Sequence, residues 1–201
     1  MMLRSLCVFC GSSFGSRPEY RRAAEDMGAL LAAHKIRLIY GGGNVGLMGA
    51  LADACLAAGG FVTGVMPQLL TDKELAHRGL TELHVVKSMH ERKAMMAELA
   101  DAFVALPGGF GTFEEFFEVL TWTQLGLQNK ACGLINVAGY YDSLLGLVDN
   151  AAAEGFLKSE HRALVLAADS ATEILDRLMH FELKTVPKWS GLAKVSIDAI
   201  T

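Results

Sequence analysis

Carboxylates that directly follow a glycine cluster are the first candidates for catalysis in this sequence. Residues 106–122 read LPGGFGTFEEFFEVLTW, so the glycines lead straight into a predicted helix carrying Glu114, Glu115 and Glu118. No Lys or Arg occurs from residue 94 to residue 129. Because like charges one helical turn apart repel each other, cations from another part of the fold must lie beside these carboxylates.

The glycine cluster itself, PGGFGT at residues 107–112, is typical of a phosphate-binding turn. It lacks the G-K-[ST] ending of a Walker loop, so triphosphate hydrolysis is not expected. Small residues at a helix N-terminus leave backbone N–H groups exposed, and these attract a phosphate together with the helix dipole. Thr112 adds a hydroxyl at the same point. The plainer alternative is that the glycines only permit a tight turn between strand and helix.

Another glycine cluster, IYGGGNVGLMG, lies earlier in the chain and contains G-x-G-x-x-G at Gly41, Gly43 and Gly46. That spacing after a strand is a dinucleotide fingerprint, which raises an NAD-linked enzyme as an alternative. The acidic residue expected about 20 positions later is missing, since the next strand ends in VTGVMPQ. Two glycine clusters at neighbouring strand ends therefore favour the binding of one phosphate over a complete dinucleotide site.

Arg92 is the best candidate for the missing cation. In the segment MHERKAMM it lies on the same helical side as Met89 and Met96, and a charge that points inward is costly unless it is paired. Two alternatives stand beside a pair with Glu115: the Arg92 guanidinium could reach into water, or Glu115 could cap its own helix through the box Thr112-x-x-Glu115. Arg92 begins near the opposite edge of its layer, so the sequence leaves open whether a second subunit brings it to the glycines.

Predicted strands alternate with predicted helices along the chain. Strands are predicted over residues 3–10, 37–40, 61–66, 84–87, 102–106, 133–137 and 164–167. Helices are predicted over residues 18–34, 45–58, 89–100, 112–125, 140–154 and 171–181, and capping boxes start three of them at Ser16, Ser88 and Ser170. Strands such as RLIY and FVAL are apolar on both faces, which predicts an α/β fold: a doubly wound parallel sheet with helices on both faces.

Length and composition suit one soluble domain. The chain has 201 residues, 52% of them hydrophobic, and a net charge of −4 without a basic run. We therefore expect no nucleic acid as partner, and no membrane, because no apolar stretch reaches the length of a span. Residues 1–184 form the predicted domain, and residues 185–201 form a tail without a clear period. The N-terminal alternation indicates a first strand rather than a signal peptide, so we expect a cytoplasmic protein.

Four scattered cysteines include a C-x-x-C at Cys7 and Cys10. Positions three apart on a strand point to opposite faces, and no second C-x-x-C or paired His completes a zinc site. We interpret the cysteines as reduced core thiols and expect no metal and no cofactor.

The segments GGGNVGLMG, MHERK and PGGFGTFEE resemble those of the LONELY GUY (LOG) family, once labelled possible lysine decarboxylases. The resemblance runs from CVFCGSS to about Phe181, and every fixed position of P-G-G-x-G-T-x-x-E is matched. It implies a Rossmann-like homodimer that hydrolyses the N-glycosidic bond of adenine-type nucleoside 5′-monophosphates, AMP or cytokinin ribotides, to the free base and ribose 5-phosphate. No lysine is marked as a pyridoxal phosphate anchor, so decarboxylation is not expected.

The resemblance also implies roles for individual residues. Arg92 and Glu115 would be the catalytic pair. Substrate contacts would come from the glycine turn and helix start, and from three further positions: Gly109, Phe110, Gly111, Thr112, Phe113, Glu114, Glu74, Lys93 and Thr121. Glu74 lies in QLLTDKEL, the least distinctive of these segments.

The sequence leaves three questions open. A non-catalytic nucleotide-binding protein with the same phosphate turn is the alternative function, although phosphate capture alone needs neither Arg92 nor Glu115. The helix VGLMGALADACLAAGG carries one charge, Asp53, and must be covered almost all round, either within one subunit or in a dimer. No residue settles the choice between plain and prenylated adenine.

Overall fold

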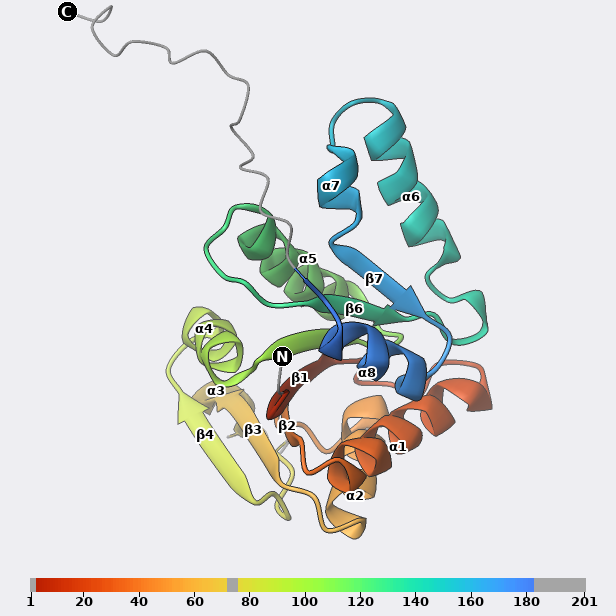
Figure 1. Ribbon diagram of the computed structural model, residues 1–201. Coiled ribbons are helices and arrows are strands. Elements are labelled where there is room, and N and C mark those ends of the chain that lie inside the picture. Colours follow the sequence, from red (N-terminus) through yellow and green to blue (C-terminus); the bar gives the residue numbers. More distant parts are fainter. Residues whose placement is uncertain (1–2, 72–75, 183–201) are drawn as a thin grey trace, which may run out of the picture.

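A computed structural model describes residues 3–71 and 76–182, which form one layered α/β unit (Figure 1). Seven strands make a single sheet in the order β4-β3-β2-β1-β5-β6-β7, and every neighbouring pair is parallel. The predicted α/β fold is therefore confirmed. The predicted tail at residues 185–201 lies outside the described residues.

All seven predicted strands are present, and their ends differ from the predicted ones by at most two residues. The strands are β1 Ser5–Phe9, β2 Arg37–Tyr40, β3 Val62–Pro67, β4 Glu82–Val86, β5 Ala102–Ala105, β6 Cys132–Ile135 and β7 Val165–Ala168. β1, β2, β3, β5 and β6 are almost wholly buried, as expected for parallel strands covered on both faces.

The helices include two short turns, α3 and α7, that the sequence pattern did not predict. The helices are α1 Pro18–Ala33, α2 Gly46–Ala57, α3 Gln68–Thr71, α4 Met89–Leu99, α5 Phe110–Gln124, α6 Asp142–Ala153, α7 Ser159–Arg162 and α8 Ala171–Met179, with a 3₁₀ turn, η1, at Val137–Gly139. None of the helices in the described part of the chain combines the length and apolar character that a membrane crossing demands.

The caps at Ser88 and Ser170 are confirmed, because each hydroxyl accepts a hydrogen bond from the amide three residues on. The predicted cap at Ser16 is wrong. Helix α1 begins at Pro18 with Arg17 in the capping position and no side-chain cap bond. Proline at the first helical position has no N–H to satisfy, which removes part of the need for a cap.

Two apolar layers flank the sheet (Figure 1). Leu6 and Val8 of β1 pack with α1, α2 and α8 on one face, whereas Cys7 and Phe9 pack with α4, α5 and α6 on the other. Cys10 belongs to the first layer, so the two thiols of the C-x-x-C face opposite sides of the sheet, as predicted. All four cysteines are free and buried, and burial raises the pKa of Cys55 to about 11 and that of Cys132 to about 12. These are inert thiols at neutral pH.

The position of β1 decides where a ligand can bind. β1 pairs with β2 on one side and with β5 on the other, so the chain order reverses between β1 and β5. In doubly wound folds this switch point opens a crevice beyond the carboxyl ends of the strands. Here the turns that follow β1 and β5 meet, because the amide of Gly11 donates to the carbonyl of Pro107 at 3.0 Å.

Candidate active site

Helix α5 begins two residues earlier than predicted. Gly109 is its capping residue and has no side-chain bond, and Thr112 lies inside the first turn. The predicted capping box from Thr112 to Glu115 is therefore wrong, because its threonine does not occupy the cap. Phe116 of this helix is buried, whereas Phe117 is 36% exposed.

The first turn of α5 presents unused backbone donors. The carbonyl of Gly109 accepts from the amide of Phe113 at 3.1 Å. The amides of Gly109, Phe110 and Gly111 have no acceptor among the residues that the structure describes. A Cβ added at Gly109 or Gly111 would meet nothing within 4 Å. Free amides, open space and the positive end of the helix dipole together suit an anion.

Arg92 and Glu115 form a buried ion pair within a single chain. Nη1 of Arg92 lies 3.1 Å from Oε1 of Glu115, and the two side chains are 11% and 12% exposed. Nε of Arg92 also donates to the carbonyl of Val65 at 3.0 Å. The guanidinium is thus not in water, and no second subunit is needed to bring Arg92 to Glu115. The sequence left this point open because a helical wheel fixes a side but not the reach of a long side chain.

The glycine turn at Gly41–Gly46, the first along the chain, makes room for the Arg92 side chain. A Cβ at Gly41 would lie 2.0 Å from Nη2 of Arg92, so the guanidinium rests against the bare backbone of this residue. Gly46 has φ +56° and lies against the backbone of Ser12 and Ser13. The amide of Leu47, at the start of α2, already donates to the carbonyl of Gly11 at 3.1 Å. The chain itself therefore fills the space around Gly41 and Gly46, where the fingerprint would require room for a pyrophosphate.

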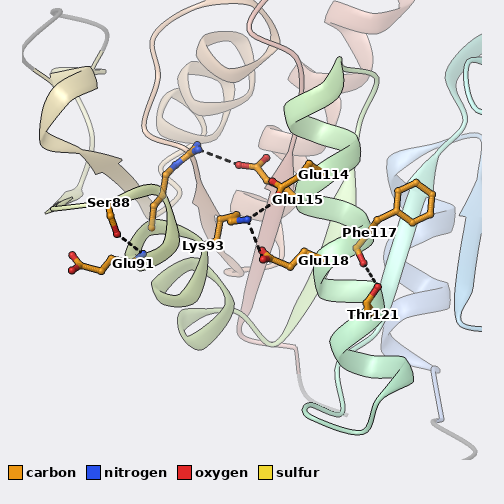
Figure 2. Close-up of polar contacts among 9 residues, drawn as sticks. Ser88, Glu91, Lys93, Glu114, Glu115, Phe117, Glu118 and Thr121 are labelled. Carbon is orange, nitrogen blue, oxygen red and sulfur yellow. Dashed lines mark hydrogen bonds and ion pairs between the residues drawn. The ribbon is translucent and has the colours of Figure 1, made fainter. Parts of the chain in front are cut away.

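Lys93 forms ion pairs with the other two carboxylates of α5, those of Glu114 and Glu118 (Figure 2). Its Nζ lies 3.0 Å from Oε1 of Glu118 and also contacts Oε1 of Glu114. Burial disfavours the Lys93 cation, but the hydrogen bonds to both carboxylates outweigh it and raise its pKa. Helix α4 thus supplies two adjacent cations that compensate three carboxylates of α5.

Glu115 differs from its neighbours in its environment. Burial raises the pKa of Glu115 above its usual 4.5, although the nearby Arg92 cation works in the opposite direction. Oε2 of the neighbouring Glu118 is also buried, without a hydrogen-bond partner in the described structure. A carboxylate with a raised pKa beside a cation is the kind of group that active sites use.

A cavity of about 330 Å³ lies between the turns that follow β1 and β5. Its walls come from Gly11–Gly15, Leu47 and Pro107–Gly109, and from Tyr20 and Tyr140. The sequence did not single out Ser12, Ser13 or the two tyrosines. The signal available for the serines was their place directly after a buried strand at the switch point, in CGSS.

Not all of the predicted site residues come together. Glu74 lies outside the described residues. Thr121 lies further along α5, one turn after Phe117, and its hydroxyl bonds the carbonyl of Phe117 at 2.6 Å (Figure 2). Phe113 packs edge-on against Tyr141, with 6.4 Å between ring centroids.

Two further observations complete the geometry. The Phe110 side chain is 93% exposed at the start of α5. Across residues 3–71 and 76–182, no three His, Cys, Asp or Glu side chains converge as metal ligands.

The strand order and a polar site at the switch point define a Rossmann-like α/β protein. Solved structures agree: a molybdenum cofactor binding protein from Rippkaea orientalis superposes with a TM-score of 0.67 over 89% of this chain and 98% of its own, at 20% identity. A Chlamydomonas reinhardtii molybdenum cofactor carrier protein gives a TM-score of 0.65, at 19% identity over 87% of this chain and 97% of its own. At these identities the likeness concerns the fold alone.

Sequence relatives are much more similar. The family model described as possible lysine decarboxylase matches residues 48–178. A cytokinin riboside 5′-monophosphate phosphoribohydrolase of Rhodococcoides fascians is 56% identical over 164 residues, 81% of this chain and 83% of its own. One with the same name from Arabidopsis thaliana is 47% identical over 198 residues, 98% of this chain and 91% of its own. The chain belongs to the LONELY GUY (LOG) family, which carried the older decarboxylase description.

Proposed function

We propose that the protein hydrolyses the N-glycosidic bond of cytokinin riboside 5′-monophosphates and of AMP, releasing the free base and ribose 5-phosphate. One observation carries the proposal. Glu115, in its buried ion pair with Arg92, lies one to two turns into α5, and the amides at the start of that helix, at Gly109–Gly111, are unused. The relatives named above are cytokinin riboside 5′-monophosphate phosphoribohydrolases. The free amides of Gly109–Gly111 are suited to bind the phosphate of such a substrate.

The phosphate is the anchor in this proposal. The amides of Gly109, Phe110 and Gly111 hold it at the helix N-terminus, and Thr112 lies in the same turn. Binding energy gained at this remote group fixes the ribose for reaction at its anomeric carbon. Nucleosides without the 5′-phosphate are therefore poor substrates.

Glu115 acts at the ribose. Breaking the bond to the base builds positive charge on the sugar ring, and a carboxylate beside the ring stabilises that charge. Water then adds to the anomeric carbon and loses a proton, while the bond electrons and a proton go to the departing base. Arg92 holds Glu115 in place and favours its ionised form.

A nucleotide panel with product detection tests the activity. AMP, isopentenyladenosine monophosphate, GMP and CMP are compared, with adenosine as the substrate that lacks phosphate. We expect release of adenine or prenylated adenine and little reaction with adenosine. Binding of AMP without release of a base would identify a nucleotide-binding protein without turnover and contradict the proposal. Glu115→Gln should lose at least about 100-fold in turnover.

We also propose that the protein works as a cytoplasmic homodimer. Phe117, Leu147 and Phe156 are exposed around a groove of about 370 Å³ between α5, α6 and α7, and exposed apolar patches mark association surfaces. Thr121 lines the same groove, so a second copy on this face would lie against it. Light scattering of Phe117→Glu tests this: a dimer unaffected by the charge would contradict the interface.

A further inference from the structure

Two consecutive tyrosines reach the glycine turn from an unusual bend after β6. Ala138 there has φ 51° and ψ 33°, a left-handed conformation that is unfavourable for a residue with a Cβ, and Gly139 has φ 73°. The Asn136 side chain holds the bend by accepting from the amide of Tyr141 at 2.6 Å. The bend thus places Tyr140 and Tyr141 side by side at the start of α6.

Each tyrosine donates to a backbone carbonyl of the turn after β5. The hydroxyl of Tyr141 bonds the carbonyl of Leu106 at 2.7 Å, and the hydroxyl of Tyr140 bonds the carbonyl of Gly108. The carbonyl between them, that of Pro107, accepts from the amide of Gly11. Three successive carbonyls of the turn therefore have fixed partners.

The two tyrosine bonds differ in what they orient. In a trans peptide the carbonyl and the next N–H point in opposite directions, and the described chain contains no cis peptide. Holding the carbonyl of Gly108 therefore sets the direction of the Gly109 amide, one of the unused donors. Holding the carbonyl of Leu106 sets no donor, because the next residue is Pro107 and has no N–H.

We infer that Tyr140 is a positioning residue of the phosphate-binding turn: its hydroxyl fixes the Gly108–Gly109 peptide so that the Gly109 amide is held ready for the anion. The inference rests on the proposed function. Tyr140 is also in edge contact with Tyr20 and Tyr141, at 5.6 Å and 5.0 Å between ring centroids. A phenylalanine keeps both ring contacts and removes only the hydrogen bond, which separates positioning from packing.

Tyr140→Phe and Tyr141→Phe are the matched pair of variants. They are neighbours, lose the same atom, and each lose one bond to a carbonyl of the same turn. Binding of ribose 5-phosphate to each full chain is measured by calorimetry, so that the readout does not depend on turnover. Melting temperature and the KM and kcat for AMP are measured on the same samples.

We expect Tyr140→Phe to weaken ribose 5-phosphate binding and raise KM by roughly 5- to 10-fold, the effect of losing one hydrogen bond, with a smaller change in kcat. Tyr141→Phe should lower the melting temperature and leave ribose 5-phosphate affinity unchanged. If the unaltered chain binds ribose 5-phosphate and Tyr140→Phe binds it equally well, the inference is overturned while the proposed function stands. An equal loss of ribose 5-phosphate affinity in both variants would also overturn the inference, because it would indicate that either change loosens the whole turn. If the unaltered chain itself does not bind, the phosphate anchor fails and the inference fails with it.

Discussion

The two glycine turns of this protein have similar sequences and opposite surroundings. Gly41–Gly46 follows β2 and opens α2, and Gly108–Gly111 follows β5 and opens α5. Around the first turn the chain fills the space, with the Arg92 guanidinium against Gly41 and backbone against Gly46. At the second turn, Gly109 and Gly111 face open space and their amides are unused.

The difference shows that glycine serves two purposes in these turns. In the first, the missing side chain admits another part of the same protein, which makes the turn a packing device. In the second, Gly108 also packs against the protein, but the missing side chains of Gly109 and Gly111 leave room for a ligand. The Arg92–Glu115 pair connects the two, because Arg92 rests on the first turn and Glu115 belongs to the helix that the second turn opens.

Gly46→Ala should have the largest effect, on stability. Its Cβ would lie 2.3 Å from the backbone of Ser12 and Ser13, at a φ of +56°. We expect a loss of at least about 3 kcal/mol in the free energy of unfolding, measured in urea. Gly59→Ala is the control, because its φ is +77° but nothing lies within 4 Å, and it should cost only about 1–2 kcal/mol. Equal losses would mean that conformation, not filled space, makes Gly46 necessary.

Gly41→Ala should come next, with its main effect on turnover. The added Cβ displaces Nη2 of Arg92, a flexible side-chain end, so the fold can adjust while the contact with Glu115 is lost. We expect kcat for AMP to fall by about 100-fold with a cooperative unfolding transition retained. Normal turnover in a folded Gly41→Ala protein would show that the position of Arg92 does not matter to the reaction.

Gly111→Ala should act only on the ligand. Its Cβ meets no protein atom, so stability should be unchanged or slightly higher, as alanine favours helix. Because the Cβ enters the space beside the free amides, KM for AMP should rise by about 10-fold, equivalent to about 1.4 kcal/mol. Gly146→Ala in α6, also without neighbours within 4 Å, is the control and should leave KM alone. An unchanged KM in Gly111→Ala would place the phosphate elsewhere.

The pH dependence should give the smallest effect and test the link between the turns. Turnover requires ionised Glu115, and burial raises the pKa of that carboxyl above 4.5. Activity should therefore fall, as pH is lowered, at a higher pH than for an ordinary glutamate. The negative charge of Glu114 contributes to the raised pKa, so Glu114→Gln should move the acid limb of the pH–rate profile towards lower pH. A limb that moves to higher pH, or stays in place, would show that another group controls it.

Much of this architecture was predictable because it follows from local patterns. Doubly apolar strands predicted the parallel sheet, and Ser88 and Ser170 predicted their helix starts. The errors have local causes as well: Pro18 made a cap at Ser16 unnecessary, and Gly109 rather than Thr112 capped α5. The role that the family resemblance implies for Thr121 stays a prediction; within the chain its hydroxyl bonds the carbonyl of Phe117.

Local sequence patterns were enough to predict the order of strands and helices, the glycine turns at strand ends, and the need of three carboxylates for cations from another part of the fold. These follow from hydrophobic periodicity, backbone freedom and charge, which act between residues close in the chain. The three-dimensional arrangement was needed to show that Arg92 reaches Glu115 within one chain and that Tyr140 holds the Gly108 carbonyl. It also showed that the protein fills the space at Gly41 and Gly46 but leaves Gly109 and Gly111 open. The two side-chain contacts join residues 23 or more positions apart. The open or filled state of a glycine turn depends on which atoms from elsewhere in the fold lie beside it. A local sequence pattern encodes neither.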